Sequence, residues 1–249
     1  MEVSRSGHVE QSVHSTRLVP VSALNEPLKR QMASLYLASY DATSEALFLH
    51  DLAEKHEVLL LHAGDELVGF TSLRILEREW QGRPIHVVYS GDTVVEREHW
   101  GQQALAFSWI TRMGALKRER PDVPLYWLLL VKGHRTFRYL PVFGKSFHPH
   151  WSIDRSDLKP LADALAQELF PDDYNPATGI VEFSRSRGHL KPHIAQPAPA
   201  ELEREGVRFF LERNPGFRRG HELVCLCEVE EPNMKPLTRR LFQKGVHAQ

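Results

Sequence analysis

Several patterns that would identify a common class of protein are missing from the chain. No apolar run reaches the roughly 20 residues that a membrane-spanning helix needs, and the first residues lack the apolar core of a signal peptide. Lysine and arginine number 31 against 32 aspartate and glutamate residues, so no excess of positive charge points to a nucleic acid or to a membrane surface. We therefore expect a cytoplasmic protein that binds neither nucleic acid nor membrane.

Cysteine is scarce as well. Cys225 and Cys227 are the two cysteines of the chain, and their spacing along one extended run is a poor geometry for a disulfide. A metal site would need a second cysteine or histidine pair at matching spacing, and the 14 histidines are scattered. We predict two reduced thiols in a reducing compartment and no bound metal.

Three common motifs are also absent. No glycine-rich dinucleotide fingerprint follows an early strand, and there is no P-loop. The Gly-x-Ser-x-Gly elbow of serine hydrolases is missing too. With 42% hydrophobic and 25% charged residues, the composition is that of an ordinary globular protein. The length allows one large domain, or one domain with an elaboration.

The most informative stretch runs from Ile85 to Trp109. It begins as a run rich in β-branched residues at 85–95, passes through five mostly polar residues to Gly101, and continues with a helical pattern from Gln102. A strand that leads into a helix start leaves backbone N–H groups without intrahelical partners, and they point outward with the positive end of the helix dipole. Glycine lets an anion approach that backbone closely. We predict an anion-binding turn here.

The elements around this stretch can be placed by periodicity and turn chemistry. Pro27 suits the first turn of an early helix, and Thr43 is the expected cap of a second helix. The apolar run at 125–131 fits a strand buried on both faces. The predicted elements, in chain order, are a strand at 15–21, helices from 26 and from 45, antiparallel strands at 58–62, 67–75 and 85–95, a helix from 102, a strand at 125–131, and a further helix.

This order of elements resembles the Gcn5-related N-acetyltransferase (GNAT) superfamily over roughly Thr16 to Phe147. The resemblance implies an α/β fold with a mixed sheet, in which the strand before a pyrophosphate loop splays from the next strand. In that family the pantetheine arm of the cofactor fills the gap. By position, the splayed strand here is Ser90–Glu96. The resemblance implies an N-acyltransferase that moves an acetyl or longer acyl group from acetyl-CoA, or another acyl-CoA, to a small-molecule amine.

The loop pattern of the family is partly present. Trp100 falls where arginine is common, Gly101 matches a glycine of the loop, and Gln103 falls where a second glycine is common. Backbone amides can hold an anion with glutamine at those positions, because the donors are main-chain groups. The residues that the resemblance assigns to cofactor binding are Thr93, Val94, Val95, Trp100, Gly101, Gln102, Gln103, Ala104 and Lys132.

A second agreement follows the apolar strand. Many family members place asparagine at the end of this strand and tyrosine seven positions later. Here Lys132 takes the first position and Tyr139 the second. Such a tyrosine commonly donates a proton to the leaving thiolate, a role that a phenol pKa near about 10 suits. We therefore predict that Tyr139 is catalytic, and packing between helix and sheet is its structural alternative.

Formation of an amide also needs a deprotonated amine. Asp92 is the base that we predict, and Glu96 and His86 are the other candidates on or beside the strand. A structural role is the simpler interpretation of any one of them, and deprotonation through water is a further route. Strand alternation places His86 and Ser90 on one face, unless a bulge intervenes.

The last hundred residues fit the family least. We predict a flexible N-terminus at 1–13 and a single domain at 14–249, in which 14–147 holds the cofactor site and 148–249 completes the sheet and adds a helical elaboration. The expected elements of this second part are a helix capped by Ser156, strands at 179–184 and 221–229, a basic loop at 185–199, a helix at 201–212 and an amphipathic tail from 232. The basic loop is either solvated or a lid near the cofactor phosphates or an acidic acceptor.

The elaboration suggests an acceptor larger than a free amino acid, or a donor with a longer acyl chain. Phe209, Phe210 and Phe217 could line an apolar pocket, although core packing is the commoner role of such residues. Two other functions stay open. One is a relative that takes its acyl group from acyl carrier protein and makes N-acyl amino acids or lactone-type signals. The other is a non-catalytic module that binds an acyl-CoA or a nucleotide.

Overall fold

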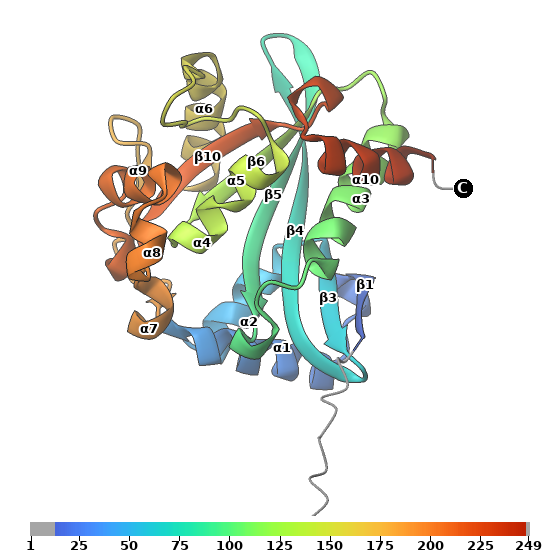
Figure 1. Ribbon diagram of the computed structural model, residues 1–249, viewed down its shortest axis with the longest axis vertical. Helices are drawn as coiled ribbons and strands as arrows, with labels where there is room; N and C mark the ends of the chain where they lie inside the picture. The colour runs from blue at the N-terminus through green and yellow to red at the C-terminus, as the bar shows by residue number, and fades with distance from the viewer. Residues whose placement is uncertain (1–12, 248–249) are drawn as a thin grey trace, which may run out of the picture.

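One long sheet runs through the molecule and organises the other elements (Figure 1). The computed structural model describes residues 13–247, so the predicted flexible N-terminus lies, except for its last residue, outside the described residues. The strands are β1 (His14–Pro20), β2 (Tyr40–Asp41), β3 (Glu57–Ala63), β4 (Glu66–Trp80), β5 (Arg83–Val95), β6 (Leu125–Val131), β7 (Tyr174–Asn175), β8 (Ile180–Val181), β9 (His189–Leu190) and β10 (Glu222–Glu228).

The eight-stranded sheet has the order β1-β3-β4-β5-β6-β10-β8-β7, and β2 and β9 pair separately. All neighbours in the large sheet are antiparallel except β5 and β6, which are parallel. The predicted α/β fold with a mixed sheet is confirmed. The two strands expected late in the chain are present as β8 and β10, and they pair with each other.

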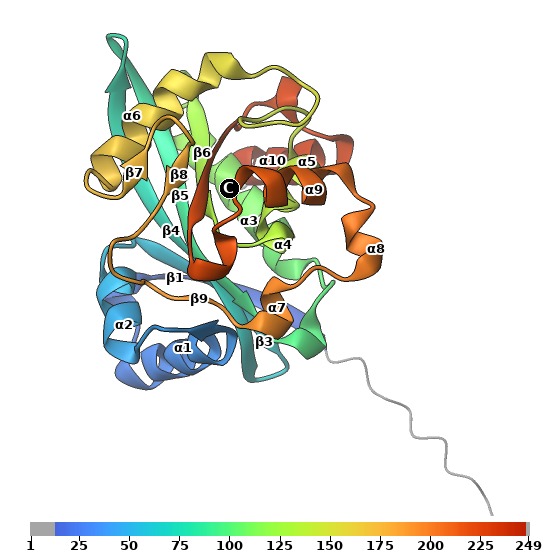
Figure 2. The same cartoon turned by 90° about the vertical axis from the view of Figure 1, so that its left-hand side faces the viewer.

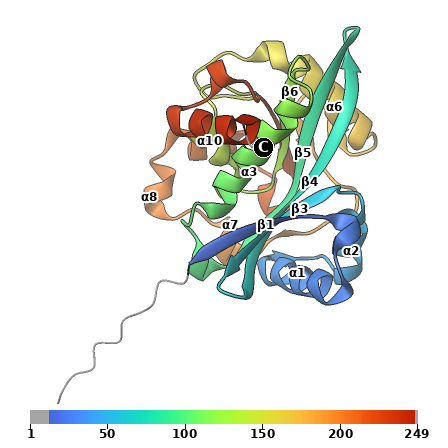
Figure 3. The same ribbon diagram turned by 90° about the vertical axis from the view of Figure 1, so that its right-hand side faces the viewer.

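Helices cover both faces of the sheet (Figures 2 and 3). The helices are α1 (Glu26–Ser39), α2 (Glu45–Ala53), α3 (Ala104–Glu119), α4 (His134–Phe137), α5 (Tyr139–Phe143), α6 (Lys159–Leu169), α7 (Pro192–Ala195), α8 (Pro199–Leu202), α9 (Glu205–Arg213) and α10 (Pro236–His247). On one face, α1, α2 and α6 pack against the strands, and on the other face α3, α5, α9 and α10 do so. Because side chains alternate along a strand, β6 sends Trp127 and Leu129 to the α3 face and Leu128 to the α6 face.

Three predicted helix starts were wrong. Ser44, not Thr43, caps α2, and its side chain accepts a hydrogen bond from the Leu47 amide at 3.2 Å. Ser156 opens a 3₁₀ turn at Ser156–Leu158, and α6 follows without a side-chain cap. The helix expected from residue 102 begins at Ala104, because a 3₁₀ turn (Arg97–His99) and a left-handed glycine precede it.

The C-terminal elaboration is more structured than predicted. The expected basic loop at 185–199 contains β9 and α7, and the helix expected at 201–212 is divided into α8 and α9. Phe210 and Phe217 are buried in the core and Phe209 packs against it, so these residues have the core-packing role. A 3₁₀ turn at Glu231–Asn233 leads to α10.

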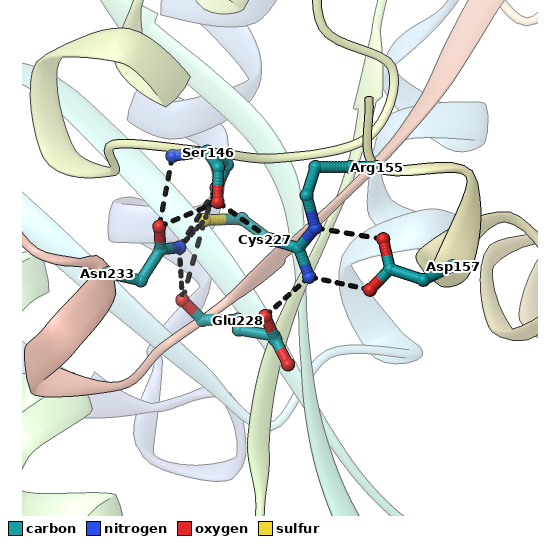
Figure 4. Close-up of polar contacts among 6 residues, drawn as sticks. All are labelled: Ser146, Arg155, Asp157, Cys227, Glu228 and Asn233. Atoms are coloured by element: carbon teal, nitrogen blue, oxygen red, sulfur yellow. Dashed lines mark hydrogen bonds and ion pairs between the residues drawn. The ribbon is translucent and has the colours of Figure 1, made fainter. Parts of the chain in front are cut away.

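A polar cluster fastens the end of β10 to the connector that follows α5 (Figure 4). Arg155 bonds both oxygens of Asp157 at 2.9 Å and the carboxylate of Glu228 at 2.6 Å. The Asn233 side-chain amide donates to the backbone carbonyls of Ser146 and Glu228, at 2.9 and 3.0 Å. Side-chain to backbone bonds of this kind stabilise a connector that has little regular structure of its own.

The two cysteines of β10 are free and buried. Burial raises the pKa of the Cys227 thiol to about 12, so the thiol stays protonated at neutral pH. A protonated, buried thiol is a poor nucleophile. The cysteines therefore act as small apolar residues of the core.

Glycines on both helices allow α10 to lie close against α3. A Cβ added at Gly245 would collide with the Thr111 carbonyl, and one added at Gly114 would collide with the Phe242 carbonyl. Leu241 and Phe242 are buried at this contact. The predicted amphipathic tail is therefore a helix that completes the core.

Replacement of Gly245 by alanine tests this contact. In an isolated helix, Gly→Ala would stabilise by about 1 kcal/mol. Here we expect Gly245→Ala to lower the free energy of unfolding by about 1–3 kcal/mol, because the added methyl forces the helices apart. Denaturant unfolding measures the change, and Lys244→Ala, on the exposed side of α10, is the matched control. A stabilised Gly245→Ala variant would show that α10 does not rest on α3.

Candidate functional site

β5 and β6 part midway along β5. Their parallel pairing joins residues 86–90 to residues 125–129 and ends there, while β5 continues to Val95 paired with β4. At the last pair, the Trp127 indole donates a hydrogen bond to Ser90 Oγ at 2.9 Å. One edge of β5 beyond Ser90 therefore faces a gap within its own sheet, as the sequence resemblance implied.

A bulge lies at the same point of β5. The pairing register with β4 shifts there, so that Gly91 and Asp92 together lie opposite Ser72. A Cβ at position 91 would approach both Ser72 Oγ and Lys55 Cε to 2.5 Å. Glycine at this position lets the Lys55 side chain pass close to the strand, and the bulge changes the face to which the following side chains point.

The backbone edge of β5 offers hydrogen-bonding groups to the gap. The Glu96 amide donates to the Val68 carbonyl on β4 at 2.9 Å, so by alternation the groups of Thr93 and Val95 face away from β4. The Trp100 indole donates to the Val95 carbonyl at 2.8 Å. The Trp100 side chain thus occupies one hydrogen-bond acceptor of this edge, and the backbone N–H and C=O of Thr93 are left for a ligand.

A cavity of about 30 Å³ lies beside the gap on the α3 face. Leu105, Ala106 and Trp109 of α3 line it, together with Tyr139. The Tyr139 ring stacks on Phe143 with centroids 5.8 Å apart. Burial raises the pKa of Tyr139 above its ordinary value, so the phenol keeps its proton at neutral pH and can donate it.

The larger cavity, about 260 Å³, lies on the opposite face, between α1, α2 and the ends of β5 and β6. Aromatic side chains from six segments form its walls: Tyr36, Tyr40, Phe48, Tyr89, Phe170 and Phe183. Ser90, Thr93 and Thr136 line both cavities. The two cavities therefore adjoin each other through the gap between β5 and β6.

Four charged groups at the larger cavity form two ion pairs. Lys55 lies 2.6 Å from Asp51, and Lys132 lies 3.0 Å from Glu222. Lys55 packs behind the bulge, and the other three residues line the cavity. Such pairs offset much of the desolvation cost of burying charge.

Asp92 is the carboxylate of this cavity that has no hydrogen-bond or ion-pair partner among residues 13–247. Burial, reinforced by the nearby charge of Asp51, raises the pKa of Asp92 to about 6 from an ordinary 3.8. At neutral pH it is mostly ionised and still binds a proton more strongly than a solvated aspartate does. This is the property that a general base needs.

The turn before α3 keeps part of the expected anion site. Gly101 has a left-handed backbone (φ 89°). The Gln102 side chain accepts a hydrogen bond from the Leu105 amide at 3.4 Å, and no acidic residue lies in the first turn of α3. The guanidinium groups of Arg135 and Arg97 lie 4.7 and 5.9 Å from the Trp100 ring centroid, which adds positive charge beside the helix start.

The elaboration holds one of these arginines in place. Arg135 lies 3.3 Å from Glu201 and bonds the Ile194 carbonyl. Glu201 also lies 3.2 Å from His134 and 3.4 Å from Arg138. The segment α7–α8 is thereby linked to the α4–α5 segment that carries Tyr139.

The structure brings some of the predicted site residues together and separates others. Tyr139 and Asp92 lie at adjoining cavities, and Thr93 lines both. The Val94 side chain is buried in the core under α1 and α2. Lys132 lines the larger cavity instead of the smaller cavity. The linings of the two cavities do not include Val95, Trp100, Gly101, Gln102, Gln103, Ala104, His86 or Glu96.

Sequence reasoning missed three residues of the site, Asp51, Lys55 and Thr136, and included Arg187 only within the basic loop at 185–199. Asp51 and Lys55 are spaced as an i, i+4 pair, which reads as ordinary surface charge. Thr136 lies within the segment between Lys132 and Tyr139, where a hydroxyl at the splay gives no signal of its own. Nothing in the sequence places Arg187 beside α1.

The charge of Asp92 has a cost that can be measured. Because the folded chain binds this proton more tightly than the unfolded chain, ionisation destabilises the fold as pH rises from about 4 to about 6. We expect Asp92→Asn to be more stable than the unsubstituted protein by about 1–3 kcal/mol at pH 7.5, and equally stable near pH 3.8. Urea unfolding at the two pH values measures this, and Asp122→Asn, an exposed turn residue, is the control. A loss of stability at pH 7.5 would show that the carboxylate is favourably bound.

No family model and no characterised protein matches the sequence. Solved structures match part of the chain. A GCN5-related N-acetyltransferase from Kribbella flavida aligns over 53% of this chain and 34% of its own, with 19% identity and a TM-score of 0.38. The GNAT family N-acetyltransferase YhbS from Escherichia coli, in complex with CoA, aligns over 53% and 71%, with 16% identity and a TM-score of 0.36.

A ribosomal-protein-alanine N-acetyltransferase from Brucella melitensis aligns over 57% of this chain and 99% of its own, with 15% identity and a TM-score of 0.40. The chain spans about a third of the length of the Kribbella flavida enzyme. Within residues 13–247, no helix is long and apolar enough to cross a membrane. The described residues form a mixed α/β fold with one parallel strand pair, a splay between β5 and β6, and a bulge in β5.

Proposed function

We propose that the protein is an N-acyltransferase that moves an acetyl or longer acyl group from a CoA thioester to an amine. The observation that carries the proposal is the pair of cavities on opposite faces of the sheet, which share Ser90, Thr93 and Thr136. Two reactants that enter from opposite faces would meet between β5 and β6. Such an arrangement suits the joining of a donor to an acceptor.

The residues at the two cavities can supply the proton transfers of the reaction. In the larger cavity, Asp92 takes a proton from the ammonium of the acceptor, and the free amine attacks the thioester carbonyl. The carbon–sulfur bond then breaks and the amide forms. Tyr139, in the smaller cavity, donates its proton to the departing thiolate, and Asp92 holds the proton that the amine released. As the amide forms, its nitrogen loses a second proton, which passes through water to the Tyr139 phenolate, and Asp92 returns its own proton to solvent to complete the cycle.

The donor would lie along β5 on the α3 face. The open backbone groups of Thr93 suit the amides of a pantetheine arm, and the amides at the start of α3 suit its phosphates. Arg97 and Arg135 add positive charge near Trp100. Because Trp100 already bonds the Val95 carbonyl, the pantetheine arm would have one strand acceptor fewer to bond on this edge.

Donor binding is tested directly by thermal stability. We expect acetyl-CoA, longer acyl-CoAs or free CoA, at a hundredfold excess over the dissociation constant, to add about 2.7 kcal/mol of stability. Release of free thiol in the presence of a panel of amines then measures transfer. Holo acyl carrier protein, charged with the same acyl groups, is the comparison donor. Stabilisation by the carrier protein but not by CoA would contradict the CoA donor, and no thiol release with either would contradict the transferase.

The role of Tyr139 is tested by removal of its hydroxyl. We expect Tyr139→Phe to lower kcat by about 100-fold or more, because the thiolate loses its proton donor, and to leave the affinity for acyl-CoA within a factor of two. Tyr126→Phe, on β6 but outside both cavities, is the matched control. An unchanged kcat in Tyr139→Phe would assign the ring to packing alone.

A further inference from the structure

The larger cavity is lined by one carboxylate and one guanidinium that have no ion-pair partner within residues 13–247. Asp92, on its β5 wall, has no partner within residues 13–247. Arg187 also lines the cavity, and its guanidinium lies 4.7 Å from the Phe183 ring centroid, without a carboxylate partner among the same residues. The remaining cations and carboxylates pair with each other, Lys55 with Asp51 and Lys132 with Glu222. The cavity therefore presents one free anion and one free cation to a ligand.

Several walls of the same cavity are aromatic. Burial raises the pKa of Tyr36 to about 12 and raises the pKa of Tyr89 well above its ordinary value, so both phenols keep their protons. Phe48 and Phe170 add apolar surface. A ligand body that suits these walls is apolar or aromatic.

The size of the cavity limits the ligand. Its volume of about 260 Å³ is just below the range of about 300–1,000 Å³ that is usual for drug-sized ligands. A compact molecule fits such a space better than a peptide or an oligosaccharide does.

The elaboration holds Arg187 at the cavity. Tyr36 donates a hydrogen bond to the Arg187 carbonyl at 3.3 Å, and the Lys191 amide donates to the Ser39 carbonyl at 3.0 Å. Between these points Tyr40 of β2 pairs with Leu190 of β9. These bonds fix the backbone of the segment 187–191 against α1, and the exposed Arg187 side chain extends from it to line the cavity.

We propose that the acceptor is a free amino acid with an apolar or aromatic side chain. Its ammonium lies at Asp92, its carboxylate bonds the guanidinium of Arg187, and its side chain packs among the aromatic walls. Guanidinium and carboxylate form strong, charge-assisted hydrogen bonds. The proposal rests on the proposed acyl transfer and gives its product as an N-acyl amino acid and a free thiol. It replaces the expectation from sequence of an acceptor larger than a free amino acid.

The test compares amines that differ in the carboxylate alone. L-phenylalanine is paired with 2-phenylethylamine, and L-leucine with 3-methylbutylamine, with acetyl-CoA as donor. We expect kcat/KM for each amino acid to exceed that for its decarboxylated partner by on the order of 10- to 100-fold. In Arg187→Gln the two kcat/KM values should differ by less than about threefold. Arg187→Lys should give an intermediate ratio, because lysine keeps the charge but lacks the planar, two-pronged donor geometry of the guanidinium. Arg185→Gln, an exposed neighbour outside the cavity lining, should keep the original ratio.

Two results would overturn the proposal while leaving acyl transfer intact. One is equal use of the amino acid and its decarboxylated partner by the unsubstituted protein, and the other is an equal loss for both in Arg187→Gln. Thermal stabilisation by L-phenylalanine without a donor gives an independent measure. We expect L-phenylalanine to stabilise the protein, 2-phenylethylamine not to do so, and Arg187→Gln to remove the difference. This result would support the amino-acid site even if no thiol is released. In that case the proposed transferase would fail and the amino-acid site would not.

Discussion

The separation of β5 from β6 after Ser90 is the constraint on which the site depends. Inside a sheet nearly every backbone N–H and C=O group is paired, yet β5 from Gly91 to Val95 has β4 on one side and, among residues 13–247, no strand on the other. The indole of Trp127, bonded to Ser90 Oγ, marks where pairing ends. The open edge must be satisfied by water, by a side chain or by a ligand. Trp100 satisfies one carbonyl, and the rest of the edge is where a ligand gains most by binding.

The bulge decides which reactant each side chain of β5 can reach. Strict alternation from Ser90, which faces Trp127 on the α3 face, would turn Asp92 and Val94 to that same face. Instead Asp92 lines the cavity on the opposite face, and Val94 is buried under α1 and α2. One extra residue in the strand therefore moves the predicted base from the α3 face, where the smaller cavity lies, to the face of the larger cavity. Gly91 makes this geometry compatible with the Lys55 side chain packed behind it.

Sequence patterns predict the elements of this fold that depend on residues close together in the chain. The apolar run at 125–131 coincides with β6, and the strand and helix order up to residue 131 follows from periodicity and turns. Patterns fail where distant segments meet. The bonds that bring residues 187–191 to α1, and the paired glycines that seat α10 on α3, depend on contacts more than 100 residues apart. For the same reason Tyr139 and Asp92 could be given individual roles from sequence, since they lie on the helix and strand that the fold resemblance covers, whereas Arg187 could be placed only within a basic loop.

The distribution of charge in the larger cavity argues that Asp92 is kept for function. A buried carboxylate without a partner destabilises a fold, and the same cavity shows how the cost is avoided, since Lys55 and Lys132 neutralise Asp51 and Glu222 at 2.6 and 3.0 Å. Asp92 lies beside both pairs and joins neither. Burial raises the pKa of Asp92 to about 6. Lys132 is paired with Glu222, and its attraction for Asp92 offsets only part of this effect of burial. An unpaired carboxyl at this cavity supports the proposal that Asp92 receives a proton or binds a cation from outside the chain.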